Sequence, residues 1–270
     1  MTWAGWSIEP PLAYVAVAGL LYWLGGRGRP SEWRTTAAFA AGLVTIVLAL
    51  DSPLDADADA LFWAHMLQHV LLLTVAPPLI LLGKPWPRMW RALPLSMRTK
   101  VGRSLARSPA AAPLRALARP LPAWLLFNAT IVAWHLPAAY NATLTTPWVH
   151  QLEHAMFFFT GLLFWARVID PGPLRPKLVW PARIAYVVGA MVVGWLLAIA
   201  LVLDPHPLYA HYATLARRPG GITAVTDQQI AAGMMWVPGS IAYTIAMMLG
   251  LYRWLEPDTA PRPQLPALPT

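Results

Sequence analysis

Long runs of apolar residues with almost no charge recur along the chain, separated by shorter polar stretches. Their lengths approach the roughly 20 residues that a helix needs to cross a bilayer. The runs occupy residues 11–25, 35–50, 61–83, 121–136, 148–169, 182–203 and 228–255. The pattern predicts a polytopic membrane protein of the all-α class, folded as a seven-helix transmembrane bundle. The first run lacks a small-residue cleavage site, so we expect a retained helix rather than a signal peptide.

Local signals mark several helix boundaries. Thr146, followed by Pro147, is typical of an N-cap with proline at the first helical position. Thr226, with Gln229 three residues later, resembles a capping box at the start of the last helix. The adjacent prolines at 77 and 78 predict a kink or a break in the third helix.

Composition excludes several classes of protein. Hydrophobic residues make up 57% of the 270 positions and charged residues only 12%, which excludes a soluble enzyme. The chain contains no Cys, which excludes disulfides, zinc–thiolate sites, iron–sulfur clusters and thiol redox chemistry. Any metal must therefore be held by His, Met or oxygen ligands.

The net charge of +8 is distributed unevenly between alternate loops. Of the 20 Lys and Arg residues, all but Arg217 and Arg218 lie in loops, helix ends or the tail on one side of the predicted bundle. The positive-inside rule makes that side cytoplasmic, with the N-terminus outside and the C-terminus in the cytoplasm. The basic residues then orient the protein among membrane lipids, and we expect no nucleic acid partner.

The chain divides into a transmembrane domain, residues 1–256, and a Pro-rich tail, residues 257–270, which we expect to be disordered. The domain includes a basic cytoplasmic loop at residues 84–119. We interpret this loop as a solvated segment that orients the bundle. The alternative is a helix lying on the anionic inner leaflet.

All seven histidines fall on the predicted outer side. His65 and His69, like His150 and His154, are spaced four residues apart, so both imidazoles of each pair project from one helix face. The two pairs reach a comparable depth, and His135 near the outer end of the fourth helix lies slightly shallower. Three helices are thus predicted to converge on a polar site in the outer leaflet.

Polar groups at this depth often mark function, but helix–helix hydrogen bonding is the simpler alternative. Gln68 and Glu153 share turns with these histidines and are candidates to fix an imidazole tautomer. His206 and His211 lie in an outer loop, where a wet histidine needs no ligand.

The ligand types favour some metals over others. Imidazole suits copper and zinc, and thioether selects Cu(I), with Met66, Met234 and Met235 near the outer helix ends. A b-type haem is the competing use of paired imidazoles, although two His on one turn are redundant as axial ligands. No catalytic motif is visible, so we do not expect an enzyme.

Five stretches of sequence carry a family resemblance. They are SPLD at 52–55, HMLQHVLLLTVAPPLILLGKP at 65–85, WHLPAAYNATL at 134–144, HQLEHAMFFFTGLLFWARVI at 150–169 and DQQIAAGMMWVPG at 227–239. In this order they resemble the CtaG family of cytochrome c oxidase assembly factors, the multi-span type associated with caa-type oxidases.

The resemblance implies a bacterial plasma-membrane protein that helps copper reach the oxidase from the outer side. Its implied partners are oxidase subunits and a copper donor protein. The implied metal-binding positions are His65, His69, His135, His150 and His154, with Met66, Glu153 and Asp227 as weaker candidates. A haem-b electron-transfer protein, a metal-free scaffold for oxidase assembly and a copper permease remain the alternatives.

Overall fold

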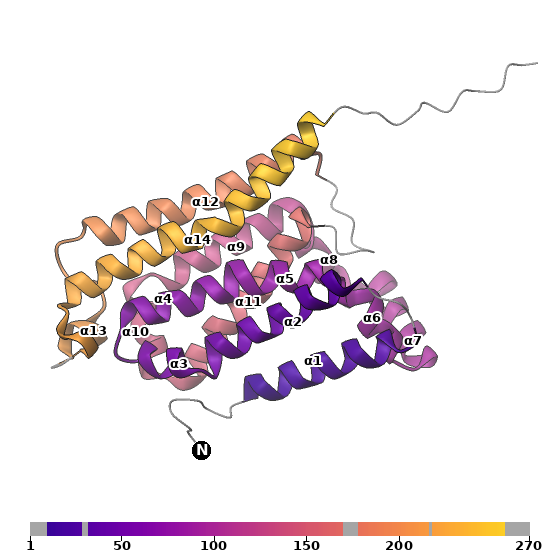
Figure 1. The fold of residues 1–270 in the computed structure, drawn as a ribbon, viewed down its shortest axis with the longest axis horizontal. Helices are drawn as coiled ribbons and strands as arrows, with labels where there is room; N and C mark the ends of the chain where they lie inside the picture. Colours follow the sequence, from indigo (N-terminus) through magenta and orange to yellow (C-terminus); the bar gives the residue numbers. More distant parts are fainter. Residues whose placement is uncertain (1–9, 29–31, 170–177, 216–217, 257–270) are drawn as a thin grey trace, which may run out of the picture.

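The computed structural model describes residues 10–28, 32–169, 178–215 and 218–256, and the elements in these parts of the chain are all helical (Figure 1). Each of the seven predicted apolar segments is a helix. They are α1 (Pro10–Gly26), α2 (Trp33–Leu50), the run of α4 (Phe62–Val70), η1 (Leu71–Val75) and α5 (Ala76–Leu82), α9 (Pro120–Trp134), α11 (Pro147–Val168), α12 (Trp180–Leu203) and α14 (Ala224–Leu255).

Shorter helices fill the connections between these segments. They are α3 (Pro53–Ala58), α6 (Pro85–Ala92), α7 (Leu95–Arg107), η2 (Pro109–Ala111), α8 (Ala112–Leu117), α10 (Pro137–Thr145), α13 (Ala210–Thr214) and η3 (Pro219–Gly221). Figure 1 shows α12 and α14 packed side by side along one edge of the bundle and α1 along the opposite edge, with α4 and α11 between them. The predicted disordered tail, 257–270, lies outside the described residues.

Among the described residues, four helices have the length and hydropathy of a membrane span: Trp33–Leu50, Phe62–Leu82, Trp180–Leu203 and Ala224–Leu255. A fifth is added if Pro109–Leu117 and Pro120–Trp134, which are bent by 71°, form one broken span. Helix α1 is apolar but only 17 residues long. The structure thus supports a helical membrane protein, while seven crossings and the orientation of the termini stay predictions.

The third apolar segment changes its helical geometry where the prolines occur. A π-helical turn, η1, separates α4 from α5, and Pro77 and Pro78 lie in the first turn of α5. Neither proline has an N–H to donate, so the carbonyl of Leu73 loses both its α-helical and its π-helical backbone partner. The structure does not show the predicted kink or break: Phe62–Leu82 is one continuous helical run, in which the hydrogen-bond register changes at η1, just before the prolines.

The basic segment 84–119 differs from the expected solvated loop. It is largely helical, and α6 packs closely on α1. At Gly25 there is no space for a side chain, because the backbone carbonyl of Arg88 lies against its α-carbon. The Arg88 guanidinium lies 4.5 Å from the Tyr22 ring centre, and the Arg91 Nε–H donates to the Gly25 carbonyl at 3.2 Å. Cation–π and backbone contacts therefore attach this segment to the bundle.

The start of the last helix also differs from expectation. Thr146 occupies the predicted N-cap position of α11, with Pro147 in the first turn, but its side chain makes no capping hydrogen bond. The N-cap of α14, however, is Thr223, whose hydroxyl accepts the Thr226 N–H at 3.1 Å. The predicted cap at Thr226 is wrong because threonines three residues apart offer similar signals, and the earlier one follows the turn at 219–221.

Candidate metal centre

Two helices bring four metal-ligating side chains together. Helix α4 supplies His65 and His69 from one face, and α11 supplies Glu153 and His154. One ligand atom from each of these four residues lies within 4.8 Å of the others, and all four residues are buried. We call these four residues the His/Glu cluster. Atoms bound to one ion at about 2.0–2.2 Å are at most about 4.4 Å apart, so only a small contraction separates this arrangement from a ligand shell.

Glu153 lies between the two histidines of α4. Its Oε2 is 3.4 Å from the Nε2 of His65 and 3.6 Å from the Nε2 of His69. The Glu153 side chain is fully buried. A buried carboxylate is strongly disfavoured unless a cation or hydrogen-bond donors compensate its charge, so this residue indicates a site for positive charge.

The predicted histidines outside the cluster extend it in two directions. The ring centre of His150 is 4.2 Å from that of His154 and 5.0 Å from that of His65. The ring centre of His135, at the C-terminus of α9, is 6.1 Å from that of His69. The structure therefore brings together all five predicted imidazoles, although only three of them belong to the compact His/Glu cluster.

Many polar atoms of these side chains lack a hydrogen-bond partner within the described part of the chain. They are His65 Nε2, both ring nitrogens of His69, His150 Nε2, both carboxylate oxygens of Glu153 and His154 Nε2. Buried polar groups are nearly always satisfied in native proteins, and those left over point to a bound ion or water. The convergence of seven such atoms makes these side chains a candidate metal ligand set.

A tyrosine fixes the orientation of His65. The Tyr212 hydroxyl, from α13, donates to the Ala58 carbonyl at 2.7 Å and lies 3.2 Å from His65 Nδ1. Since its proton is committed to Ala58, the hydroxyl must accept from His65 Nδ1–H. In the neutral imidazole the lone pair then lies on Nε2, the nitrogen that faces Glu153. Burial raises the pKa of Tyr212, so the hydroxyl stays protonated and keeps this role.

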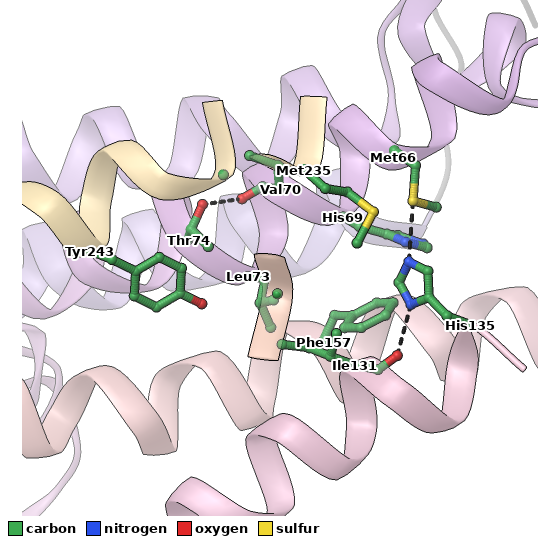
Figure 2. Close-up of a pocket in the computed structure, with 12 residues that line it drawn as sticks. Met66, His69, Val70, Leu73, Thr74, Ile131, His135, Phe157, Met235 and Tyr243 are labelled. Carbon is green, nitrogen blue, oxygen red and sulfur yellow. Dashed lines mark hydrogen bonds between the residues drawn. The ribbon is translucent and has the colours of Figure 1, made fainter. Parts of the chain in front are cut away.

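His135 and Met66 form a separate contact beside the cluster. The Nε2 of His135 lies 3.3 Å from the Met66 sulfur, and its Nδ1 lies 2.7 Å from the Ile131 carbonyl. Both side chains line a cavity of about 50 Å³ that is also bounded by His69, Phe157 and Met235 (Figure 2). Met66 is fully buried.

Two predicted candidates have other roles. Asp227 accepts the backbone N–H groups of Phe62 at 2.9 Å and Trp63 at 3.0 Å, one with each carboxylate oxygen. It therefore caps α4 from another helix, and the structure does not bring it into the His/Glu cluster. Gln68 donates to Ala49 and Asp55, both at 2.7 Å, and so does not orient an imidazole.

The outer-loop histidines also stay apart from the cluster. The His206 side chain is 86% exposed, and His211 Nε2 lies 3.0 Å from the Asp59 carbonyl. Three tyrosines that cover the site were not predicted from the sequence: Tyr140, Tyr209 and Tyr212. Their aromatic character was visible, but no periodic pattern connects α10 and α13 with α4.

Comparison with known proteins assigns the chain to a family. Residues 12–256 match the sequence model of the cytochrome c oxidase caa3 assembly factors. The chain belongs to this family. The long apolar helices agree with a membrane location.

Individual relatives add little about function. The chain is similar to uncharacterized proteins of Mycobacterium bovis and Mycobacterium tuberculosis, with 26% identity over 86% of this chain and 36% of each relative. A protein of Mycobacterium leprae, also uncharacterized, is 24% identical over 86% of this chain and 35% of its own length. The chain thus spans about a third of the length of these relatives. No solved structure matches it.

Proposed function

We propose that this assembly factor binds copper at the His/Glu cluster and assists its delivery to cytochrome c oxidase on the outer side of the bacterial plasma membrane. The observation that carries the proposal is the buried Glu153 carboxylate, surrounded by imidazole nitrogens that have no hydrogen-bond partner among the described residues. Imidazole and carboxylate form a ligand set suited to copper, and its affinity should be lower than that of a thiolate cage. Such a site can release its ion to a recipient.

The proposal includes the membrane topology. We place the cluster in the outer half of a seven-helix bundle, with the N-terminus outside and the C-terminus cytoplasmic. The basic segment 84–119, which contains nine Lys and Arg residues and no acidic residue, supports this orientation. A donor protein on the outer side would then reach the cluster, and an oxidase subunit would receive the ion there.

Haem is the less favoured occupant. The ring centre of each of the five imidazoles lies within 6.1 Å of another, and the cavity beside them, about 50 Å³, has room for only a few water molecules. A porphyrin would have to separate helices that pack through buried aromatic side chains. A metal-free scaffold for oxidase assembly is the other alternative, and it makes the opposite prediction in a metal-binding experiment.

The test is metal analysis of the detergent-purified protein after loading with copper(II) and washing, together with an absorption spectrum. We expect copper near one equivalent per chain in the wild type and at most about a tenth of that in His69→Ala or Glu153→Gln. His206→Ala, in an exposed loop, is the matched control and should retain copper.

The outcomes separate the alternatives. Copper retained in both cluster variants overturns the proposed site. A Soret band in protein from haem-replete cells supports haem. Absence of both metal and haem, together with oxidase assembly that persists in the His69→Ala strain, supports the scaffold.

A further inference from the structure

The contact between His135 and Met66 lies next to the His/Glu cluster but has a different chemistry. The imidazole comes from the end of α9 and the thioether from the middle of α4, 69 positions apart in the sequence. Both residues are buried, with exposed fractions of 7% for His135 and 0% for Met66. Nothing in the carboxylate chemistry of Glu153 explains why these two side chains meet.

The protonation of His135 makes the contact unusual. A carbonyl oxygen only accepts, so the Nδ1 that lies 2.7 Å from the Ile131 carbonyl must carry the proton. In the neutral imidazole Nε2 then bears a lone pair. The sulfur of Met66, 3.3 Å away, also has only lone pairs to offer. In the neutral imidazole, a nitrogen lone pair and a sulfur lone pair thus face each other in a buried position.

The surroundings add a second thioether and a shared imidazole. Met235 of α14 and His69 of α4 line the same cavity as Met66 and His135 (Figure 2). Neither ring nitrogen of His69 has a hydrogen-bond partner in the described part of the chain, although its Nε2 faces Glu153 at 3.6 Å. His69 therefore borders both the His/Glu cluster and this cavity.

We propose that Met66, His135 and Met235 form a second metal site, selective for a soft monovalent cation such as Cu(I), beside the His/Glu cluster. Thioether sulfur selects Cu(I) over divalent ions, whereas imidazole with carboxylate suits divalent copper or zinc. The two sites then differ in the ion they prefer, and His69 is placed to bind at either. Only ligand exchange is involved, with no change in the oxidation state of the ion.

This inference rests on the proposed function for the identity of the physiological ion, but it can be tested independently of copper. The probe is Ag(I), a soft monovalent ion that mimics Cu(I) without redox chemistry. The full chain in detergent is titrated with Ag(I), and bound silver is measured after desalting. We expect about one tightly bound equivalent in the wild type.

The variants separate the two sites. Met66→Leu with Met235→Leu keeps the side-chain volume nearly constant and should lose about nine-tenths of the bound silver. Glu153→Gln should keep the silver while losing copper(II). Met248→Leu, which changes a half-exposed methionine of α14, the helix that carries Met235, is the control and should bind silver as the wild type does. Silver binding that is unchanged in the double variant overturns the second site.

An independent measurement needs no variant. X-ray absorption spectroscopy of the wild-type protein loaded with one equivalent of Ag(I) should show sulfur neighbours, and a shell of nitrogen and oxygen alone overturns the proposal. If silver binds through sulfur but Glu153-dependent copper is never found, the second site stands and the proposed function fails. If copper binds at the His/Glu cluster and silver is not held by sulfur, the proposed function stands and the second site fails.

Discussion

The indole Nε1–H of Trp165 donates a hydrogen bond of 3.0 Å to the carbonyl of Leu73. That carbonyl has no backbone donor, because residues 77 and 78 are both proline. Gly161, one turn earlier in α11, lets the two helices approach, since a side chain there would meet the Leu73 carbonyl and Pro77 at 3.0 Å. The backbone hydrogen bond that the prolines remove is thus replaced by a side-chain hydrogen bond from α11, the helix that carries Glu153 and His154.

The first prediction concerns this hydrogen bond between Trp165 and Leu73. Trp165→Phe removes the indole donor and leaves a buried carbonyl unpaired, which should destabilise the fold by roughly 1–3 kcal/mol. The measurement is thermal unfolding in detergent, compared with the wild type. Trp148→Phe, in an exposed position on the same helix, is the control and should have almost no effect. Equal melting temperatures for the two variants would contradict the role of the hydrogen bond.

The second prediction concerns the tyrosine that orients His65. Tyr212→Phe removes the acceptor for His65 Nδ1–H, so the imidazole loses the contact that fixes its tautomer. Loss of such an outer contact typically lowers metal affinity about 10–100-fold. Copper titration should show weaker binding with unchanged stoichiometry. Tyr252→Phe, on the exposed end of α14, should bind copper normally, and unchanged affinity in Tyr212→Phe would refute the orienting role.

The third prediction separates structural from metal-binding acidic residues. Asp227→Asn loses one of the two backbone hydrogen bonds and the charge at the start of α4, so stability should fall by about 0.5–2 kcal/mol. Copper stoichiometry should not change. Unfolding and metal analysis on the same sample provide both readouts. Asp204→Asn, in the loop after α12, is the control for stability, and loss of copper in the Asp227 variant would return this residue to the ligand set.

The fourth prediction tests the attachment of the basic segment. Gly25→Ala places a methyl group against the Arg88 carbonyl and within 3.1 Å of the Ala92 amide nitrogen. Overpacking of this kind costs about 1–3 kcal/mol and should displace α6 from α1. Trypsin should then cleave faster after Arg88 and Arg91. In the control, Gly19→Ala, the new methyl group has ordinary contact at 3.6 Å with Leu43, and cleavage as fast there as in Gly25→Ala would argue against the docking.

Helical periodicity explains what the sequence could predict about the site. A spacing of four residues forces His65 and His69, and likewise His150 and His154, onto one helix face whatever the rest of the fold does. The ends of the apolar runs also predicted the ends of the corresponding helices to within a few residues, because the hydrophobic pattern follows the local helix. These are local relationships, and a single sequence displays them directly.

The features that escaped prediction are contacts between distant segments. Tyr212 meets His65 across 147 positions, and Asp227 meets Phe62 across 165. A carboxylate near the start of a helix is expected to cap that same helix, whereas Asp227, near the start of α14, caps α4. The docking of α6 on α1 depends on a close backbone approach at Gly25. A glycine within an apolar run does not indicate which other segment will pack against it.

The cap that Asp227 places on α4 has a consequence for the order of events during synthesis. All four residues of the His/Glu cluster have been synthesised once residue 154 is made. The cap of α4, the helix that carries His65 and His69, is Asp227, about 70 positions after residue 154. Met235 follows in the same last helix. A nascent chain therefore lacks this cap on α4 until α14 has been made, and we expect the His/Glu cluster to reach its final geometry only after α14 has packed on α4.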